Sequence, residues 1–145
     1  MKANKLKCTD LRIGNWVKVN DPIFGVNTYK VATIRDNGII TLSDNMSCLV
    51  DNIEPIELTE EVLVKIGFKK NKYDCWKYFP DRENEISILM TDNYTTIEYV
   101  NLFHCPQDVT EVNYGSTLEF PRRIYLHQLQ NAYFILTGEE LNIEL

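Results

Sequence analysis

Turn-forming residues recur at short intervals through the first fifty positions, and they limit this part of the chain to short strands. Gly14-Asn15 precedes the alternating run Trp16–Val19, and Asn20-Asp21-Pro22 ends that run. Two further β-type runs follow, at residues 29–35 and 39–43. These strands are too few for a sandwich, so the segment predicts a small curled β-barrel of SH3-like type.

The register of one hairpin can be predicted from its side chains. Asp36-Asn37-Gly38 separates the last two runs, and Gly38 can supply the left-handed residue of a three-residue loop. A two-residue Asn-Gly loop would mix polar and apolar residues on both faces, so we favour the three-residue loop. The predicted cross-strand pairs are then Ile34 with Ile40, Ala32 with Leu42 and Lys30 with Asp44.

A second module begins near Glu54-Pro55. Thr59 is placed to cap a short helix that Gly67 ends. Residues 73–79, 85–91 and 95–103 then form strand-like runs, and Asp92-Asn93 is the turn expected before the third. They predict an antiparallel meander.

The remaining chain predicts one more helix. Residues 104–121 show no sustained period, although residues 110–112 could pair with 117–119 in a hairpin. Residues 122–136 have helical periodicity, and the alternating tail at 141–145 could add an edge strand. The predicted fold class is therefore α+β: an SH3-like β-barrel at residues 1–55, followed by an α-β-β-β-α module with an antiparallel sheet at residues 56–145.

Charge and cysteine usage indicate a cytoplasmic protein. The net charge is −6, and residues 81–145 carry eleven acidic against three basic residues, so nucleic acid and anionic membranes should be repelled. The four cysteines show no CxxC spacing, which favours reduced thiols over a metal site. Neither a secretory leader nor a membrane span is apparent. We expect no membrane partner, metal or cofactor.

No catalytic motif is present, so we expect a protein that is not an enzyme. The two histidines, His104 and His127, lie outside any GxSxG, HExxH or Walker-type pattern. We interpret His104 as a loop residue beside a buried Cys105, and His127 as a solvated or capping residue. The acidic run at residues 81–85 is interpreted as a solvated sheet edge.

One basic and aromatic segment could form a binding surface. Lysines interleaved with aromatic rings suit single-stranded nucleic acid, because cations neutralise phosphates while rings stack on bases. Alternation places Trp76 and Tyr78 on one face and Lys77 on the other, which favours a half-buried strand with solvated lysines. Trp16 could line a peptide groove together with Phe24 and Tyr29, or fill the barrel. The candidate surface comprises Trp16, Lys69, Lys70, Lys72, Trp76, Lys77 and Tyr78.

Three stretches resemble a known family. They are LRIGNWV at residues 11–17, EPIELTEEVLVKIGF at 54–68 and YLHQLQNAYFILTGEEL at 125–141. They are similar to a small uncharacterised protein family of Bacteroidetes phages and integrated mobile elements. Val62 stands where that family often has Trp, and Leu126 stands where Val is usual; both exchanges keep an apolar side chain. The resemblance implies a shared fold and assigns no activity, ligand or catalytic residue.

The leading functional hypothesis is a phage or mobile-element accessory protein that acts as a non-enzymatic protein-interaction module. Its expected partner is a protein of unknown identity. The alternative is a module that associates with single-stranded nucleic acid through the Lys69–Tyr78 segment.

Overall fold

The structure is a computed structural model that describes residues 5–101 and 115–145. These residues form mostly antiparallel β-sheet with two α-helices, which confirms the predicted α+β class. The chain divides into two compact units: Met1–Glu57 with Tyr125–Asn131, and Leu58–Ile124 with Ala132–Leu145. The sequence placed residues 125–131 in the second module, whereas their contacts group them with the first.

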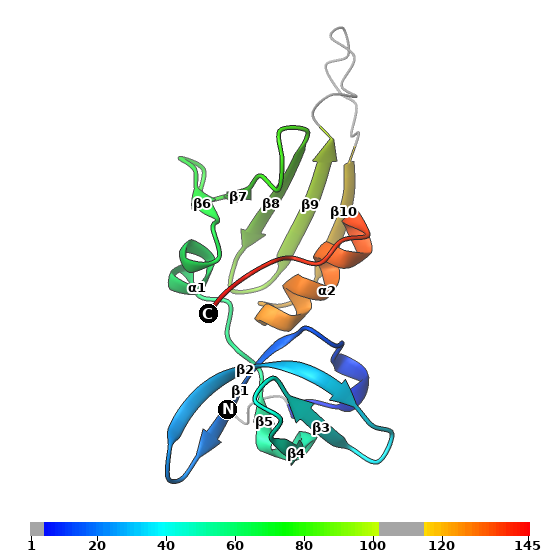
Figure 1. The fold of residues 1–145 in the computed structure, drawn as a ribbon. Helices are drawn as coiled ribbons and strands as arrows, with labels where there is room; N and C mark the ends of the chain where they lie inside the picture. Colours follow the sequence, from blue (N-terminus) through cyan, green and yellow to red (C-terminus); the bar gives the residue numbers. More distant parts are fainter. Residues whose placement is uncertain (1–4, 102–114) are drawn as a thin grey trace, which may run out of the picture. The chain divides into compact units, whose positions relative to one another are not determined.

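The first unit contains a five-stranded antiparallel sheet in the order β4-β3-β2-β1-β5 (Figure 1). The strands are β1 (Trp16–Asp21), β2 (Gly25–Ile34), β3 (Ile39–Leu42), β4 (Ser47–Leu49) and β5 (Ile53–Glu54). Short 3-10 turns precede β1 and β5, at Cys8–Asp10 (η1) and Val50–Asn52 (η2). Its buried core comprises Leu6, Leu11, Val17, Val19, Val31, Ile40, Leu42 and Ile53.

The β2–β3 hairpin has the predicted loop but not all of the predicted pairs. Gly38 adopts a φ of 84° and Ile34 pairs with Ile40, as the three-residue loop requires. The pair of Ala32 with Leu42 was wrong, because the register shifts between Val31 and Thr33. The shift pairs Val31 with Leu42 and places its larger side chain in the core.

The shift also alters the far end of this hairpin. The amide N–H of Ser43 donates to the Lys30 carbonyl at 2.9 Å. Ser43 therefore takes the position opposite Lys30 that we predicted for Asp44.

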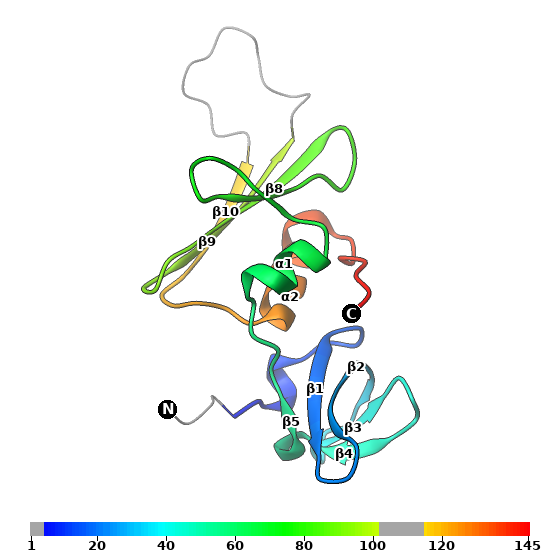
Figure 2. The same cartoon turned by 90° about the vertical axis from the view of Figure 1, so that its left-hand side faces the viewer.

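The second unit contains five antiparallel strands in the order β10-β9-β8-β7-β6. They are β6 (Lys69–Lys70), β7 (Trp76–Tyr78), β8 (Asn84–Met90), β9 (Thr95–Asn101) and β10 (Gly115–Phe120). Helix α1 (Glu60–Lys65) and the later turns of α2 (Leu126–Thr137) lie on one face of this sheet (Figure 2). Ile86, Ile88 and Ile97 are fully buried, whereas the alternate positions Ser87, Leu89 and Thr96 are half-buried on the opposite face.

The sequence did not place the two outer strands, β6 and β10, in this sheet. Residues 117–119 belong to β10 and pair with β9, as Thr117 with Glu98 and Glu119 with Thr96. Their predicted hairpin partner, residues 110–112, lies outside the described residues. The tail at residues 141–145 forms no strand; its alternation places Leu141 and Ile143 in buried positions.

Both predicted helices are present, and the main difference is where the second one begins. The Thr59 hydroxyl accepts the Val62 amide at 3.2 Å, which confirms it as the N-cap of α1. Helix α2 begins at Leu126, four residues later than predicted. Tyr125 instead forms an isolated antiparallel bridge with Glu57, which keeps the backbone extended before the helix.

Gly67 both ends α1 and adjoins an aromatic ring. Its φ is 101°, and an added Cβ would lie 3.3 Å from Cε2 of Tyr78. We expect Gly67→Ala to lower the free energy of unfolding by about 2 kcal/mol, because a left-handed alanine costs roughly 1–2 kcal/mol before any crowding. Gly25→Ala is the matched control, since Gly25 has a φ of 76° and open space around it. Urea unfolding that shows equal losses for the two variants would contradict crowding against Tyr78.

The beginning of α2 packs on the first sheet through buried amide side chains. Gln130 is 2% exposed, and its Oε1 accepts the Trp16 amide at 2.8 Å while its Nε2 donates to the Gly14 carbonyl at 3.1 Å. Asn15 is 1% exposed and donates from Nδ2 to Oδ1 of Asn131 at 2.9 Å. We call Asn15, Gln130 and Asn131 the buried amide network. The sequence placed Gln130 and Asn131 on a polar helix face, so this network was not predicted.

Candidate functional site

The two tryptophans of the predicted binding surface are buried. Trp16, at the start of β1, is 8% exposed, and Trp76, in β7, is 5% exposed. The ammonium of Lys30 lies 5.2 Å from the centroid of the Trp16 ring, and that of Lys70 lies 5.7 Å from the Trp76 ring. Neither tryptophan ring therefore presents a free face to a ligand.

Tyr78 belongs to the aromatic core of the second unit. Its ring stacks on Phe68, with centroids 5.1 Å apart, and meets the edge of Tyr133 at 6.4 Å. Burial raises the pKa of Tyr133 to about 12. The sequence correctly placed Trp76 and Tyr78 on one face of the strand, and that face is directed toward the helices.

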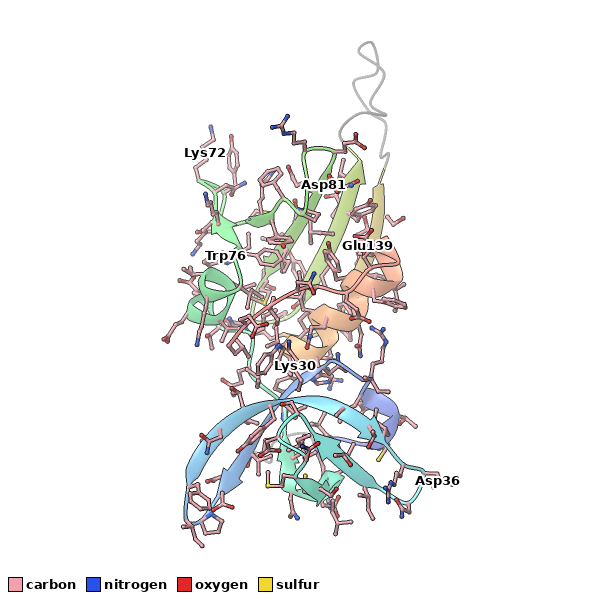
Figure 3. The ribbon with its side chains drawn as sticks, in the orientation of Figure 1. Lys30, Asp36, Lys72, Trp76, Asp81 and Glu139 are labelled. Atoms are coloured by element: carbon pink, nitrogen blue, oxygen red, sulfur yellow. The ribbon has the colours of Figure 1, made fainter. Side chains whose placement is uncertain are left out.

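The lysines of the same segment do not form one cationic patch. Lys70 pairs with Glu60 at 2.8 Å and with Asp74 at 3.3 Å, and these hydrogen bonds raise its pKa. Lys77 pairs with Glu85 at 2.7 Å. Among the predicted lysines, only Lys69 and Lys72 have no ion pair of this kind with a described residue. Lys72 lies in the turn between β6 and β7 (Figure 3), where its ammonium lies 4.9 Å from the centroid of the exposed Tyr73 ring. Most of the predicted lysines are thus held in separate ion pairs and ring contacts, and they do not form one open surface with Trp76 and Tyr78.

The histidines and the acidic run provide no catalytic or metal-binding arrangement in the described parts of the chain. His104 and Cys105 lie outside the described residues. His127 is 3% exposed, which corrects its interpretation as a solvated residue. Asp81 accepts the amides of Glu83 and Asn84 in a turn. Across residues 5–101 and 115–145, no group of three or more His, Cys, Asp or Glu side chains is placed to hold a metal ion.

The strongest candidate surface in the first unit is the β1–β2 turn. Pro22, Ile23, Phe24 and Val26 project there, and we call these four residues the tip surface. Ile23 is 83% exposed, Phe24 78% and Val26 62%. Three large apolar side chains this exposed, within four positions, are typical of an interaction site rather than of scattered surface residues.

The conformation of this turn is fixed by hydrogen bonds. Oδ1 of Asp21 accepts the amides of Ile23 at 2.7 Å and Phe24 at 2.9 Å, and these bonds lower the Asp21 pKa. Nδ2 of Asn27 donates to the Phe24 carbonyl at 3.2 Å. A turn held in this way presents its apolar side chains with little ordering entropy left to lose on binding. The sequence predicted the turn, and named Phe24 only as part of a groove with Trp16.

Beside the tip surface lies a shallow acidic concavity of about 520 Å³. Its lining includes Asp21, Asp51 and Glu54, with Val19, Met46 and Cys48 as apolar components. Lys5 pairs with Asp51 at 3.0 Å, and Lys18 with Glu54 at 3.5 Å. Asp21 forms no ion pair of this kind with a described residue, so the tip surface is apolar at its end and has one unpaired carboxylate beside it.

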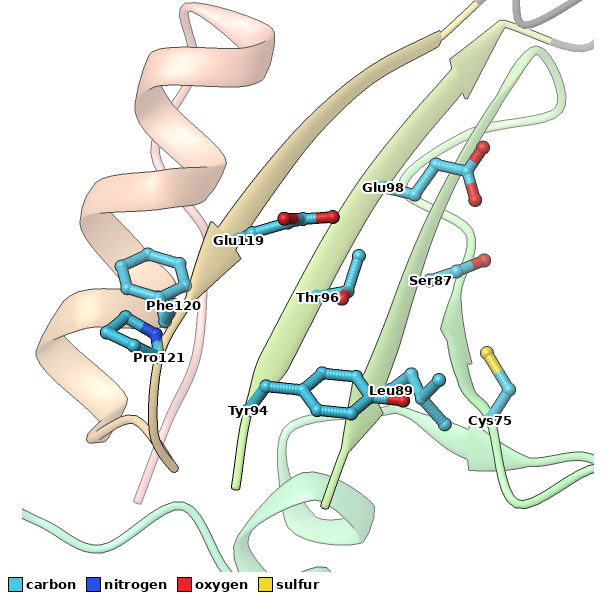
Figure 4. Close-up of a pocket in the computed structure, with 9 residues that line it drawn as sticks. All are labelled: Cys75, Ser87, Leu89, Tyr94, Thr96, Glu98, Glu119, Phe120 and Pro121. Atoms are coloured by element: carbon cyan, nitrogen blue, oxygen red, sulfur yellow. The ribbon is translucent and has the colours of Figure 1, made fainter. Parts of the chain in front are cut away.

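The second candidate surface is the sheet face opposite the helices in the second unit, which we call the open face. A concavity of about 790 Å³ lies on it (Figure 4). The lining residues come from strands β8, β9 and β10 and the loops beside them: Cys75, Ser87, Leu89, Tyr94, Thr96, Glu98, Glu119, Phe120 and Pro121. The sequence missed this surface because it depends on β10, which the sequence did not place in the sheet.

The chemistry of the open face suits binding rather than reaction. Burial raises the pKa of the Cys75 thiol, which leaves it protonated and weakly nucleophilic at neutral pH. The Ser87 hydroxyl donates to Glu85 at 2.8 Å, so a carboxylate rather than an imidazole is its partner. No described histidine lines the concavity. A nucleophile paired with a base is therefore not found there among the described residues.

Comparison of the chain with protein-family models, with curated proteins and with solved structures finds no match. Neither helix that the structure describes is long and apolar enough to cross a membrane.

Proposed function

We propose that the chain is a non-enzymatic protein-interaction module, an accessory protein of a phage or mobile element that binds a protein partner in the cytoplasm. The tip surface carries this proposal. Fully burying an isoleucine or phenylalanine side chain is worth roughly 1.5–3 kcal/mol each. Two such side chains exposed on one turn lower the solubility of the protein. A partner that covers them would gain the free energy of burying both.

The charges beside the tip surface favour a protein over a lipid surface. Asp21 remains ionised because two backbone amides donate to its carboxylate. Asp51 and Glu54 line the same concavity. Lys5 and Lys18 offset the charges of Asp51 and Glu54, so Asp21 supplies the excess of negative charge. An anionic headgroup would be repelled by it, whereas a protein groove with a basic rim would complement it.

An SH3-like barrel is the fold that we infer for the first unit. The strand order β4-β3-β2-β1-β5, the strongly curved ten-residue β2 and the 3-10 turn η2 before β5 support it. Loops that connect the strands of a rigid scaffold often carry binding residues. The β1–β2 turn is such a loop.

The test compares captured partners for two serine variants. The full-length protein, its Ile23→Ser/Phe24→Ser variant and its Ile13→Ser variant are expressed with the same tag in the native host, crosslinked and purified. We expect at least one host or element protein to be captured by the wild type and to fall at least about tenfold with the tip variant, since two apolar anchors are lost.

Ile13→Ser serves as the control because it removes an exposed apolar side chain outside the tip surface. Ile13 is 63% exposed and lies before β1, whereas the β1–β2 turn lies after that strand. Its captured proteins should match those of the wild type. An identical set of captured proteins for the tip variant and the wild type would contradict the proposal.

The two rings that the nucleic-acid alternative relies on are not available for stacking. This alternative requires ring faces for stacking, yet Trp76 is 5% exposed and Tyr78 packs against Phe68 and Tyr133.

A further inference from the structure

The open face of the second unit has the features of a site for a cationic protein segment. Side chains form two rows that cross the strands. One row contains Lys77, Ser87 and Glu98, and the other contains Leu89, Thr96 and Glu119. Glu98 lies opposite Thr117, and Glu119 lies opposite Thr96. The two glutamates are therefore diagonal neighbours on adjacent strands, with Cα atoms roughly 7–8 Å apart.

The two glutamates are not held in close ion pairs by the described cations. Neither Glu98 nor Glu119 forms an ion pair with a described residue. The nearby cation, Lys77, is held by Glu85 at 2.7 Å, and that hydrogen bond is the main cause of its raised pKa. Glu98 also contributes to the raised Lys77 pKa, so Lys77 offsets part of its charge. Glu98 is half-buried and Glu119 is exposed. Together with Glu85 they leave this face with more negative than positive charge, which makes it complementary to an added cation.

Aromatic and apolar groups adjoin the carboxylates. Tyr94 is 44% exposed, and its ring extends across the concavity beside Leu89 (Figure 4). Phe120 contributes to the lining from the end of β10. A guanidinium or ammonium near an exposed tyrosine ring is attracted by the negative face of the ring. The apolar groups would contact the aliphatic stem of the same side chain.

We propose that the open face binds an extended protein segment that carries arginine side chains, with the guanidinium groups at Glu98 and Glu119. The concavity is shallow and open to solvent, so a small cation would keep most of its water and gain little. An extended segment directs alternate side chains to one side, and that spacing of about 6.6 Å is close to the separation of the two glutamates. This binding surface lies wholly within the second unit and does not depend on the tip surface.

The test is a titration of the full-length ¹⁵N-labelled protein with an acetylated and amidated eight-residue peptide in which arginine alternates with threonine. We expect amide chemical-shift changes on β8, β9 and β10. A peptide with citrulline in place of each arginine should bind at least about tenfold more weakly, because citrulline has no charge. Glu98→Gln/Glu119→Gln should weaken binding of the arginine peptide by at least about tenfold, and Tyr94→Leu by about threefold.

The matched control is Glu61→Gln/Glu139→Gln, which removes the same net charge from exposed positions in α1 and just after α2. It should change the dissociation constant less than about twofold. An equal weakening by both double variants would overturn the proposal, because net charge alone would then explain binding. Shift changes confined to residues outside the open face would overturn it as well.

A titration with spermine separates a protein segment from a small polycation. We expect spermine to bind the open face at least about tenfold more weakly than the arginine peptide, since it has no backbone or alternating side chains to match the strands. Equal affinity at the same residues would overturn the assignment to a protein segment. The tip variant Ile23→Ser/Phe24→Ser should bind the peptide as the wild type does, so that failure here and failure of the proposed function are distinguishable.

Discussion

Gln130→Leu is expected to lower the free energy of unfolding of the first unit by about 3 kcal/mol. Leucine fills a similar volume, so the loss comes from two hydrogen bonds rather than from a cavity. The Trp16 amide and the Gly14 carbonyl both lose their Gln130 partner. A buried backbone group left without a partner costs roughly 1–3 kcal/mol, and the part-buried Gly14 carbonyl should lie at the lower end of this range. Urea unfolding followed by tryptophan fluorescence measures the change.

Amide exchange gives a second measurement of the same effect. The Trp16 amide hydrogen should exchange with solvent about 100-fold faster in the variant. The expected loss of about 3 kcal/mol is about twice the 1.4 kcal/mol that corresponds to a factor of ten in an equilibrium constant. Asn142→Leu is the control, since it makes a similar amide-to-apolar change at an exposed position in the tail. It should shift stability by less than about 0.5 kcal/mol. A Gln130→Leu protein as stable as the wild type would show that the buried amide network contributes nothing measurable.

Acidification from pH 7 to pH 5 is expected to lower stability by about 2 kcal/mol through His127 alone. Burial lowers the pKa of His127 from 6.5 to about 4, and its Nδ1 has no hydrogen-bond partner among the described residues. Between these two pKa values the unfolded chain binds a proton that the folded chain does not. Stability therefore falls as the pH falls from 6.5 toward 4, with about 3 kcal/mol lost by pH 4.

His127→Phe isolates this effect. The imidazole ring stacks on Tyr125 with an interplanar angle of 12°, and phenylalanine keeps an aromatic ring there without a titrating group. Urea unfolding at pH 7, 6 and 5 should show a steeper loss for the wild type than for the variant, while contributions from carboxylates cancel in the comparison. An NMR titration that places the His127 pKa at 6.5 or above would refute the prediction, because the nearby Asp10 would then outweigh burial.

Features that rest on local chemistry could be predicted from the sequence. Thr59 caps α1 because its hydroxyl reaches an amide three residues away, and Gly38 and Gly67 adopt the left-handed backbone that suits glycine. The α+β class followed from periodicity and turn residues. Each of these signals is contained within a few consecutive positions.

Features that rest on distant contacts could not be predicted in the same way. The bulge at Ala32 depends on which side chain the core accepts, and β10 becomes a strand only by pairing with β9. Gln130 looks like a polar surface residue until its partners, 114 and 116 positions away, are known. The open face could not be predicted for the same reason, because Glu98 and Glu119 meet only through the β9–β10 pairing.

The buried amide network also bears on how the chain acquires its structure during synthesis. About 68 residues separate Glu57 from Tyr125. A ribosome that adds roughly 5–20 residues per second needs about 3–14 s to synthesise them. Throughout that time the Gly14 carbonyl and the Trp16 amide exist without Gln130. The first sheet is thus the earliest part of the molecule to be made, but it is completed only when the seven-residue segment Tyr125–Asn131 emerges. A nascent chain paused before Tyr125 would expose the site on the first sheet where α2 docks, and this would make it a natural substrate for chaperones.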